Sequence, residues 1–443
     1  MRKLLLTAAV CLLQSAVAAQ PLTLRDAAAE ALEKNPLLVA AQAEVSAARA
    51  RREEALAAWL PVIDASASTS RSNNPVFVFG SLLEQGRFSQ EHFSPAFLND
   101  PPALRNDRLA LNVRYTLFDQ LRRRDAAKQA GEGVTRALSA AGELRQEVLA
   151  ALISRYYGVV VATQRQAVAA EAVRAAESAA KNARDRAEQG LVVDSDRLSA
   201  EVQLAEFKQQ EIAAAGDAAI ARAALAMTLG RPLMSQIELA AGLPDTTLAP
   251  ETAVDAVKRA IESRGELASA VAARNAAELQ LVTARGSLLP RVEAWSSWGA
   301  SGTTFSHRNS DHAAGVAVNL ALFDAGTYAR IAEARAGVEA AKALESLARD
   351  RVAMEAISAW NRAHAALEQV AVAAAAVSQA EAAARIVQDR YDNGLTTMTE
   401  LLRAQTALVA ARLSLLSAKQ QSISGEAELL RSIGGLREID PFL

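Results

Sequence analysis

Cysteine and aromatic residues are scarce in this chain of 443 residues. There is one cysteine, Cys11, and Phe, Trp and Tyr together occupy 4% of the positions. A single cysteine excludes an intramolecular disulfide framework. Large cores are normally filled by Leu, Ile, Val and Phe, because these side chains remove the most apolar area from water. Abundant alanine with many Glu and Arg instead indicates long helices packed side by side.

An excess of one charge is also absent, and helix breakers are missing over long stretches. The formal net charge is -2. This balance excludes a strongly basic nucleic-acid binder, and no nucleic acid is expected as a partner. No proline occurs between Pro102 and Pro232, or between Pro290 and Pro441. Such windows predict very long helices.

The N-terminus has the pattern of a secretory signal peptide. Arg2 and Lys3 precede an apolar run to Leu13, and small residues follow up to Ala19. We expect residues 1–19 to be cleaved, which would also remove Cys11; a buried N-terminal helix is the alternative. No later stretch reaches about 18 uninterrupted apolar residues, so no transmembrane helix is expected. Any membrane crossing would then use β-strands.

The second half of the chain repeats landmarks of the first half in the same order. We expect a first structural repeat over 20–228, an inter-repeat linker over 229–250 and a second repeat over 251–443. Segment 73–106 has no counterpart and is expected to be a loop. The matching segments are 59–62 with 288–291, LFD at 117–119 with LFD at 322–324, 189–191 with 393–395, and 229–230 with 433–434.

In two segments, 109–117 and 316–322, apolar residues occur at every second position. This spacing is typical of a strand with one apolar face. Weaker partner strands are expected over 62–72 and 291–303. About ten residues is the length that a tilted membrane-spanning strand needs, so we expect the apolar faces to meet outer-membrane lipid. The expected lipid-facing residues are Leu109, Leu111, Val113, Tyr115, Val316, Val318 and Leu320.

After each LFD segment a helical pattern continues for about 65 residues, which is about 100 Å of helix. A second helix then returns, with Leu401, Leu408 and Leu415 at the seven-residue period of a coiled coil. The predicted fold is mainly α with a small membrane β portion, built from duplicated long-helix hairpins and four strands per protomer. Four strands leave open edges, which lipid does not tolerate, whereas three copies give twelve.

These segments together resemble the TolC-like outer-membrane factors of Gram-negative bacteria. The resemblance covers about residues 20–440 and rests on the duplicated plan, the two LFD segments, and the turns RAEQGL at 186–191 and RYDNGL at 390–395. It implies a homotrimer with a β-barrel in the outer membrane and a long periplasmic α-barrel. It further implies export of small molecules or proteins, with a periplasmic adaptor and an inner-membrane pump as partners.

Three charged residues are candidates for a gate at the periplasmic entrance. Asp196 and Glu400 each lie six residues past a turn glycine, and Arg403 follows on the helical face of Glu400. Crowded carboxylates in a narrow mouth favour cations. The resembled family places two acids after the second turn, so Arg403 departs from its pattern. The alternative is that both acids face solvent on the outer wall.

The two turns are candidates for docking the adaptor. Glycine accepts a positive φ where the chain reverses between antiparallel helices. The apolar or small residues that follow are unusual in a solvent-facing turn, although they could serve only to cap each hairpin. The candidate docking residues are Gly190, Leu191, Val192, Gly394, Leu395 and Thr396.

No catalytic, cofactor or metal site is expected. His92, His307 and His312 are expected in loops, and His364 on a helix. No HExxH, phosphate loop or Ser/His/Asp order occurs, so the chain is not predicted to be an enzyme. Two alternatives to a channel remain. One is a periplasmic coiled-coil adaptor or scaffold, and the other is a periplasmic enzyme with helical decoration.

Overall fold

The structure is a computed structural model that describes residues 21–190, 192–240, 242–244, 252–304 and 308–436. The signal segment therefore lies outside the described residues. The first half runs in the order α1 (Leu24–Lys34), α2 (Pro36–Ala57), β1 (Val62–Ser72), α3 (Pro75–Glu84), η1 (Gln90–Phe93), α4 (Pro95–Asn99), β2 (Leu104–Phe118), α5 (Arg122–Glu188) and α6 (Asp194–Leu229). The second half runs α7 (Ala253–Ser263), α8 (Gly265–Gly286), β3 (Arg291–Gly302), β4 (Arg308–Asn319), α9 (Ala325–Asp392) and α10 (Met398–Ser432).

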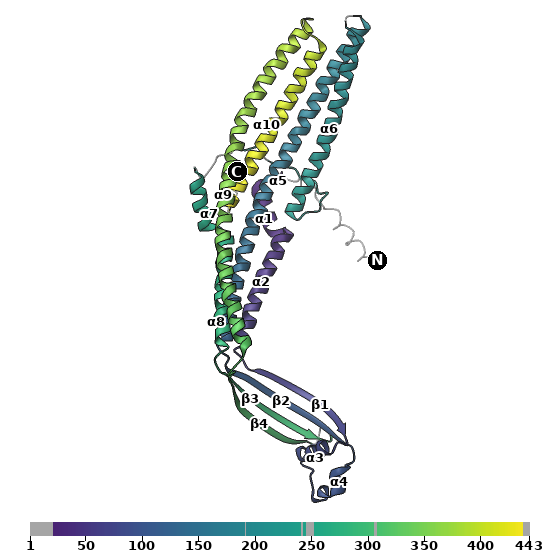
Figure 1. The fold of residues 1–443 in the computed structure, drawn as a ribbon. Helices are drawn as coiled ribbons and strands as arrows, with labels where there is room; N and C mark the ends of the chain where they lie inside the picture. Colours follow the sequence, from purple (N-terminus) through teal and green to yellow (C-terminus); the bar gives the residue numbers. More distant parts are fainter. Residues whose placement is uncertain (1–20, 191, 241, 245–251, 305–307, 437–443) are drawn as a thin grey trace, which may run out of the picture. The chain divides into compact units, whose positions relative to one another are not determined.

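The proline-free windows form the long helices that the sequence predicts. Helices α5 and α9 have 67 and 68 residues, and each is followed by a shorter helix, α6 or α10. At 1.5 Å per residue each long helix extends about 100 Å. Figure 1 shows the α5–α6 and α9–α10 hairpins as neighbouring pairs. The mainly α fold with duplicated hairpins and four strands is thus confirmed.

The aspartate of each LFD segment lies just before a long helix and accepts a hydrogen bond from its first turn. Asp119 accepts a hydrogen bond from the backbone N–H of Arg123 at 2.7 Å, in the first turn of α5. Asp324 accepts one from the backbone N–H of Gly326 at 2.9 Å, at the start of α9. The first N–H groups of a helix have no partner within it, and a carboxylate satisfies them. The repeated motif therefore supplies a carboxylate to the start of a long helix in both halves, four residues before the bonded N–H in the first and two residues before it in the second.

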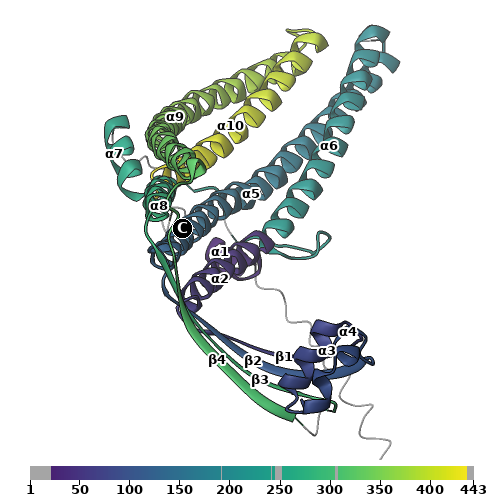
Figure 2. The ribbon, with the colours of Figure 1, turned by 60° about the horizontal axis from the view of Figure 1, so that its bottom comes forward.

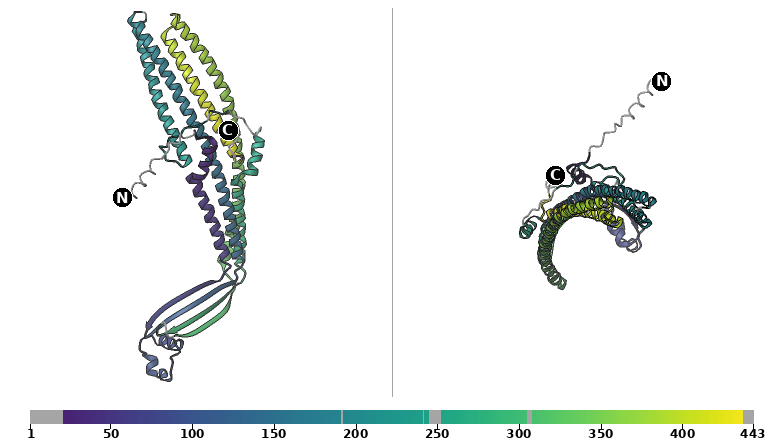
Figure 3. Two further views of the ribbon diagram at one scale, coloured as in Figure 1. Left: turned by 180° about the vertical axis from the view of Figure 1, so that it is seen from behind. Right: turned by 90° about the horizontal axis from the view of Figure 1, so that it is seen from above.

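Residues 46–136 and 270–345 form one of two compact units, and this unit contains the sheet. Its four antiparallel strands lie in the order β1-β2-β3-β4, which the left view of Figure 3 shows by their colours. One row of paired residues across the sheet is Ala65, Leu111, Trp298 and His312; the next row is Asp64, Asn112, Ser297 and Ala313. Because adjacent rows point to opposite faces, one face is mostly apolar and the other mostly polar.

Some predictions for this unit are wrong. Leu320 lies beyond β4, which ends at Asn319, so it is not a strand residue. His312 lies within β4 opposite Trp298, and His92 lies in η1; neither is in a plain loop. Segment 73–106 forms α3, η1 and α4. Pairing with β3 extends β4 through a polar stretch that has no alternating pattern of its own.

The second compact unit comprises residues 1–45, 137–269 and 346–443, of which the described part contains the ends of both hairpins. Its main core surrounds Tyr156 of α5, which is fully buried with Leu24, Leu225 and Ile423. The Tyr156 hydroxyl donates to the backbone oxygen of Leu22 at 2.8 Å. Burial beside Tyr156 raises the pKa of Tyr157 to about 12. These contacts hold α1, α5, α6 and α10 together.

Two helices are apolar enough to cross a membrane by length and composition alone. Helices α6 and α9 each contain an 18-residue window with a mean hydropathy of 1.4. The sequence expectation missed them, because isolated polar residues interrupt each window. Alanine gives these helices their apolar character and also lets neighbours approach closely: Phe207 of α6 packs on Ala172, Val173 and Ala176 of α5.

Candidate functional site

The two hairpin turns are built on glycines in the left-handed region. Gly190 has φ 72° and Gly394 has φ 71°. The Gly190 N–H donates to the Ala187 oxygen, and the Leu395 N–H donates to the Arg390 oxygen at 2.8 Å. These bonds satisfy carbonyl groups at the ends of α5 and α9 that lack helical partners. The predicted role of both glycines in chain reversal therefore has a geometric basis.

The turns present apolar side chains to solvent. Leu395 is 67% exposed and Val193, which precedes α6, is 63% exposed. Val192 and Thr396 are half-buried. Leu191, which the sequence also singles out, lies outside the described residues. Each hairpin thus ends in a small surface on which an apolar partner can be buried.

Arg186 and Tyr391 join the two hairpins next to these turns. The Arg186 guanidinium lies 4.9 Å from the centre of the Tyr391 ring, and it donates to the Tyr391 backbone oxygen at 3.5 Å. Tyr391 is 4% exposed and packs with Ala183 of α5 and Met398 of α10. Burial raises the pKa of the Tyr391 hydroxyl, and the carboxylate of Asp196 acts in the same direction. Sequence reasoning missed this contact, because its members are 205 residues apart.

Asp196, the candidate gate residue of the first hairpin, has different charged neighbours from Glu400, its counterpart in the second. Arg197 donates to Asp194 at 2.7 Å and to Glu201 at 3.0 Å, and the bond from Arg197 holds the pKa of Asp194 below its usual value. Asp196 is half-buried and close enough to affect Tyr391 electrostatically. The ion pairs of Arg197 are therefore with Asp194 and Glu201.

Glu400, the candidate gate residue of the second hairpin, forms an ion pair with Arg403, as their three-residue spacing on a helix predicts. Arg403 donates to Glu400 at 2.9 Å, and their side chains are 73% and 53% exposed. The backbone N–H of Glu400 donates to the Thr397 hydroxyl at 3.3 Å, which caps α10. Asp196 and Glu400 therefore occupy equivalent sequence positions but carry different local charge.

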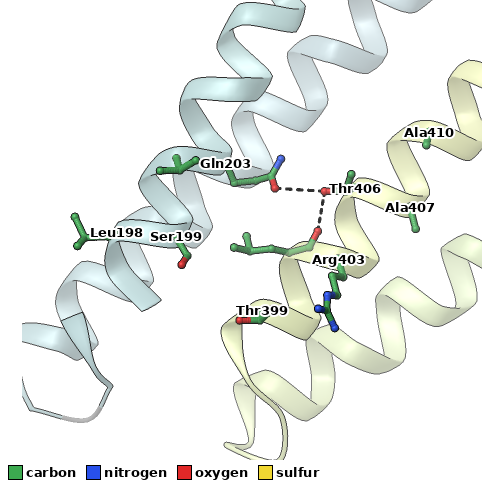
Figure 4. A pocket seen from close by; sticks show the side chains of 10 residues that line it. Leu198, Ser199, Gln203, Thr399, Arg403, Thr406, Ala407 and Ala410 are labelled. Atoms are coloured by element: carbon green, nitrogen blue, oxygen red, sulfur yellow. Dashed lines mark hydrogen bonds between the residues drawn. The ribbon is translucent and has the colours of Figure 1, made fainter. Parts of the chain in front are cut away.

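A groove separates α6 from α10 above the turns (Figure 4). It has a volume of about 690 Å³ and is bounded on the α10 side by Arg403 and Thr406. The Thr406 hydroxyl lies 3.4 Å from the Gln203 amide oxygen and donates to the Leu402 backbone oxygen at 2.9 Å. The sequence did not single out this groove, because its walls come from both repeats. Its apolar lining residues are Leu198, Val202, Leu402, Ala407 and Ala410.

The strand residues predicted to meet lipid, apart from Leu320, share one face of the sheet. The register pairs Val113 with Ser296, Leu111 with Trp298, and Val316 with Ala294. Six of the predicted lipid-facing residues lie on this face: Leu109, Leu111, Val113, Tyr115, Val316 and Val318. The alternating pattern in the sequence thus places these apolar side chains on the same face of the sheet.

No group of three His, Cys, Asp or Glu residues suited to a metal ion occurs within the described residues. His364 instead stacks on Trp360 and lies 3.6 Å from Glu368 on the same helix. His307 lies outside the described residues.

Comparison with known proteins gives a family match over most of the chain. The model of the outer membrane efflux protein family matches residues 27–231 and 256–435. Protein CyaE of Bordetella pertussis (strain Tohama I) is 28% identical over 374 residues, which cover 80% of this chain and 75% of that protein. The family match falls on both halves and leaves out residues 232–255.

Solved structures share the fold at low identity. The Campylobacter jejuni CmeC outer membrane channel aligns with a TM-score of 0.80 and 16% identity, over 93% of this chain and 85% of that one. The open state of the Neisseria gonorrhoeae MtrE outer membrane channel aligns with a TM-score of 0.75 and 19% identity, over 93% and 89%. The architecture described above is therefore that of solved outer-membrane channels.

Proposed function

This chain belongs to the outer membrane efflux protein family, and from that premise we propose how it works as an outer-membrane export channel. Family and fold are those of transport channels and not of enzymes. The protein is located in the outer membrane and has a long periplasmic extension. We propose that small molecules or proteins leave through one continuous duct, supplied by a periplasmic adaptor and an inner-membrane pump.

The sheet carries this proposal. Its two edge strands, β1 and β4, have no further partner among the described strands, and one sheet face is apolar. Unpaired backbone groups in lipid cost several kcal/mol each, so the edges must pair with other copies. Three copies supply twelve strands, an even number in the range of outer-membrane barrels. A homotrimer follows as the proposed assembly.

Roles for individual residues follow from the same arrangement. The apolar face around Leu111 and Val113 contacts lipid, and the polar face around Asn112 lines the pore. The turns at Gly190 and Gly394 dock the adaptor, and Asp196, Glu400 and Arg403 set the charge of the periplasmic entrance. The proposed organisation is a signal peptide over 1–19, two repeats over 20–228 and 251–443, and a linker over 229–250.

A periplasmic coiled-coil adaptor or scaffold is the alternative function. The long hairpins suit both functions, but an adaptor has no need of a sheet with an apolar face. Outer-membrane fractionation separates the two. We expect trimers that are extracted only by detergent and that dissociate on heating, together with ion-conducting pores when the purified protein is added to planar bilayers. A protein released by osmotic shock, without pores, would contradict the channel.

Cysteine pairs on the edge strands test the assembly itself. Cys11 is the only native cysteine and lies in the proposed signal peptide, so the mature chain offers a cysteine-free background. We expect cysteines placed along β1, at Ile63 and Ala65, to form disulfides with cysteines at Ala314 or Val316 of β4 in a neighbouring copy. Oxidation should then give dimers and covalent trimers. Exclusively monomeric product from every pair would rule out this edge pairing.

A further inference from the structure

Segment 73–103, between β1 and β2, is held together by a cluster of aromatic rings. The rings of Phe79 and Phe88 lie 4.8 Å apart at 73°, and those of Phe88 and Phe93 lie 5.0 Å apart at 86°. His92 and Phe97 add a third edge-on pair at 4.8 Å. Edge-to-face contacts of this kind are favourable aromatic geometries. These ring contacts connect the parts of the segment to one another, so we treat it as one structural unit and not as an extended loop.

The C-terminal end of α3 is fixed to the strands by hydrogen bonds. The side-chain amide of Gln85 donates to the Arg105 backbone oxygen at 2.9 Å and to the Asn106 side-chain oxygen at 3.0 Å. The backbone oxygen of Glu84 accepts from the Asn309 side chain at 3.0 Å. The Glu84 carboxylate accepts from the Ser301 hydroxyl at 3.2 Å. Three strands, β2, β3 and β4, thus hold this one helix end.

Arg108 of β2 joins the same group of side chains. Its guanidinium donates two hydrogen bonds to Asp311 of β4, at 2.8 and 2.9 Å, and a third to the Ser301 hydroxyl at 3.0 Å. The Glu84 carboxylate lies 3.6 Å from the same guanidinium. Bidentate arginine–carboxylate pairs are the strongest and most directional of such contacts. The pair with Asp311 fixes the guanidinium on the strands, where its positive charge faces the Glu84 carboxylate of α3.

These contacts lie on the polar face of the sheet. The register pairs Arg108 with Ser301 and Ser301 with Asn309, so all three point to one side. The neighbouring Leu109 points to the opposite, apolar side. Figure 2 shows α3 and α4 beside the end of the sheet, at the end opposite to where β2 leads into α5. If the apolar face meets lipid, the segment lies on the pore side.

We propose that residues 73–103 form an inward-folded plug at the extracellular mouth of the pore, and that Arg108, with Asp311 and Glu84, is its latch. The inference rests on the proposed channel function, which supplies the assignment of pore and lipid faces. In a trimer, three such plugs narrow one mouth. Loss of the latch charge loosens each plug against the wall, although the hydrogen bonds of Gln85 and Asn309 remain, and widens that mouth.

Single-channel recording in planar bilayers tests the latch. We expect Arg108→Ala and Glu84→Ala to raise the open conductance by roughly twofold, because a wider mouth lowers the resistance to ions. Arg114→Ala is the matched control, since Arg114 pairs with Asp64 at 2.5 Å on the same polar face without contacting the segment. Cells that produce Arg108→Ala should also become more sensitive to vancomycin, a large probe that enters from outside.

A disulfide tests whether the position of the plug, and not merely the charge, sets the conductance. A Cβ built on Gly86 would lie 3.5 Å from the Asn309 Cβ, which is within the range that a disulfide spans. We expect Gly86→Cys with Asn309→Cys to restore wild-type conductance to Arg108→Ala when oxidised, and to lose this effect on reduction.

Heat-modifiable trimers in the outer-membrane fraction are scored for every variant. Without trimers from the wild-type chain, the channel proposal itself fails. With trimers present, a wild-type conductance in both Arg108→Ala and Glu84→Ala would overturn the plug. An Arg114→Ala channel that is as wide as Arg108→Ala would overturn it as well, because the effect would then come from pore charge alone.

Discussion

Arg403 donates a hydrogen bond to Glu400 over 2.9 Å, across the first turn of α10. Both side chains are more than half exposed. An exposed pair of this kind contributes only about 0–1 kcal/mol to stability. Its removal therefore leaves the fold intact, and any effect on ion passage reports the local charge.

Replacement of Arg403 should change ion passage. Arg403→Ala leaves the Glu400 carboxylate without its partner, so we expect a larger open conductance and stronger cation preference. The double variant Asp196→Ala with Glu400→Ala should weaken cation preference. Both are measured as conductance and as reversal potential in a KCl gradient.

A pair of the same spacing on α9 provides the control for this gate. Lys342 lies 2.9 Å from Glu339, three residues away, and both are exposed. Lys342→Ala should leave conductance and selectivity unchanged. If the variants at Arg403, Asp196 and Glu400 behave as this control does, the three residues are surface charges on the outer wall and form no gate.

Charge on the two faces of β2 should have opposite consequences. Val113 lies on the apolar face and Asn112 on the polar face. Arginine at mid-membrane on a lipid-facing position costs about 2–4 kcal/mol. We expect Val113→Arg to reduce heat-modifiable trimers in the membrane fraction, and Val316→Arg to do the same in β4. Asn112→Arg should assemble normally, and equal yields on both faces would reverse or remove the assignment.

Local patterns predicted the elements whose causes lie close together in sequence. The proline-free windows predicted α5 and α9, and the glycines at 190 and 394 predicted the turns. Proline and glycine act on the backbone conformation within a few residues, so no distant partner is needed. The alternation from Leu109 to Leu117 gave most of β2. These features need no knowledge of what packs against them.

The errors concern residues whose structure depends on distant partners. The amino-terminal part of β4 is polar on both faces, and pairing such as Ser310 with Ala300 makes it a strand. Likewise, α3 is held by Gln85 through Asn106, 21 residues away. The Arg186–Tyr391 contact spans both repeats. Periodicity within a window carries no information on such partners, so 73–106 was predicted to be a loop.

Crosslinking tests adaptor docking at the turns. Leu395 is 67% exposed at the end of the second hairpin, and an apolar partner would bury it. We expect Leu395→Cys, in cells that make the cognate adaptor, to crosslink to that adaptor. Val372→Cys is the control, since Val372 is 71% exposed on the body of α9. Adaptor adducts at Val372 but not at Leu395 would leave the apolar turn with a capping role only.

Acid should weaken the contact between α1 and the segment after α6. Glu30 accepts a hydrogen bond from Arg231 at 2.9 Å, and this bond holds the pKa of Glu30 below its usual value. A lowered folded-state pKa gives stability that is present above the unfolded value and lost as pH falls through the folded value. We expect Glu30→Gln to lose on the order of 1 kcal/mol at pH 7.

The pH profile of that loss distinguishes charge from packing. The difference in unfolding free energy between wild type and Glu30→Gln should shrink below pH 4.5 and vanish once Glu30 is protonated in the folded state. Glu33→Gln, an exposed neighbour on α1, should show a smaller effect. Urea titrations followed by circular dichroism at several pH values measure both. A difference that is independent of pH would assign the loss to packing.

Arg264, between α7 and α8, should be the most sensitive charged residue of its unit. Its side chain is 3% exposed and pairs with Glu143 of α5 and Glu355 of α9, each at 3.0 Å. Arg264→Met removes the buried guanidinium that pairs with these partly exposed carboxylates, and Arg431 still lies 3.6 Å from Glu355, so we expect a loss of about 1–3 kcal/mol in thermal or urea unfolding. Arg351→Met is the control, because Arg351 is 61% exposed and 3.5 Å from Glu266. Adding Glu143→Gln and Glu355→Gln to Arg264→Met should recover part of the loss by removing the repulsion. If the triple variant is no more stable than Arg264→Met, packing of the arginine stem and not charge compensation holds these helices together.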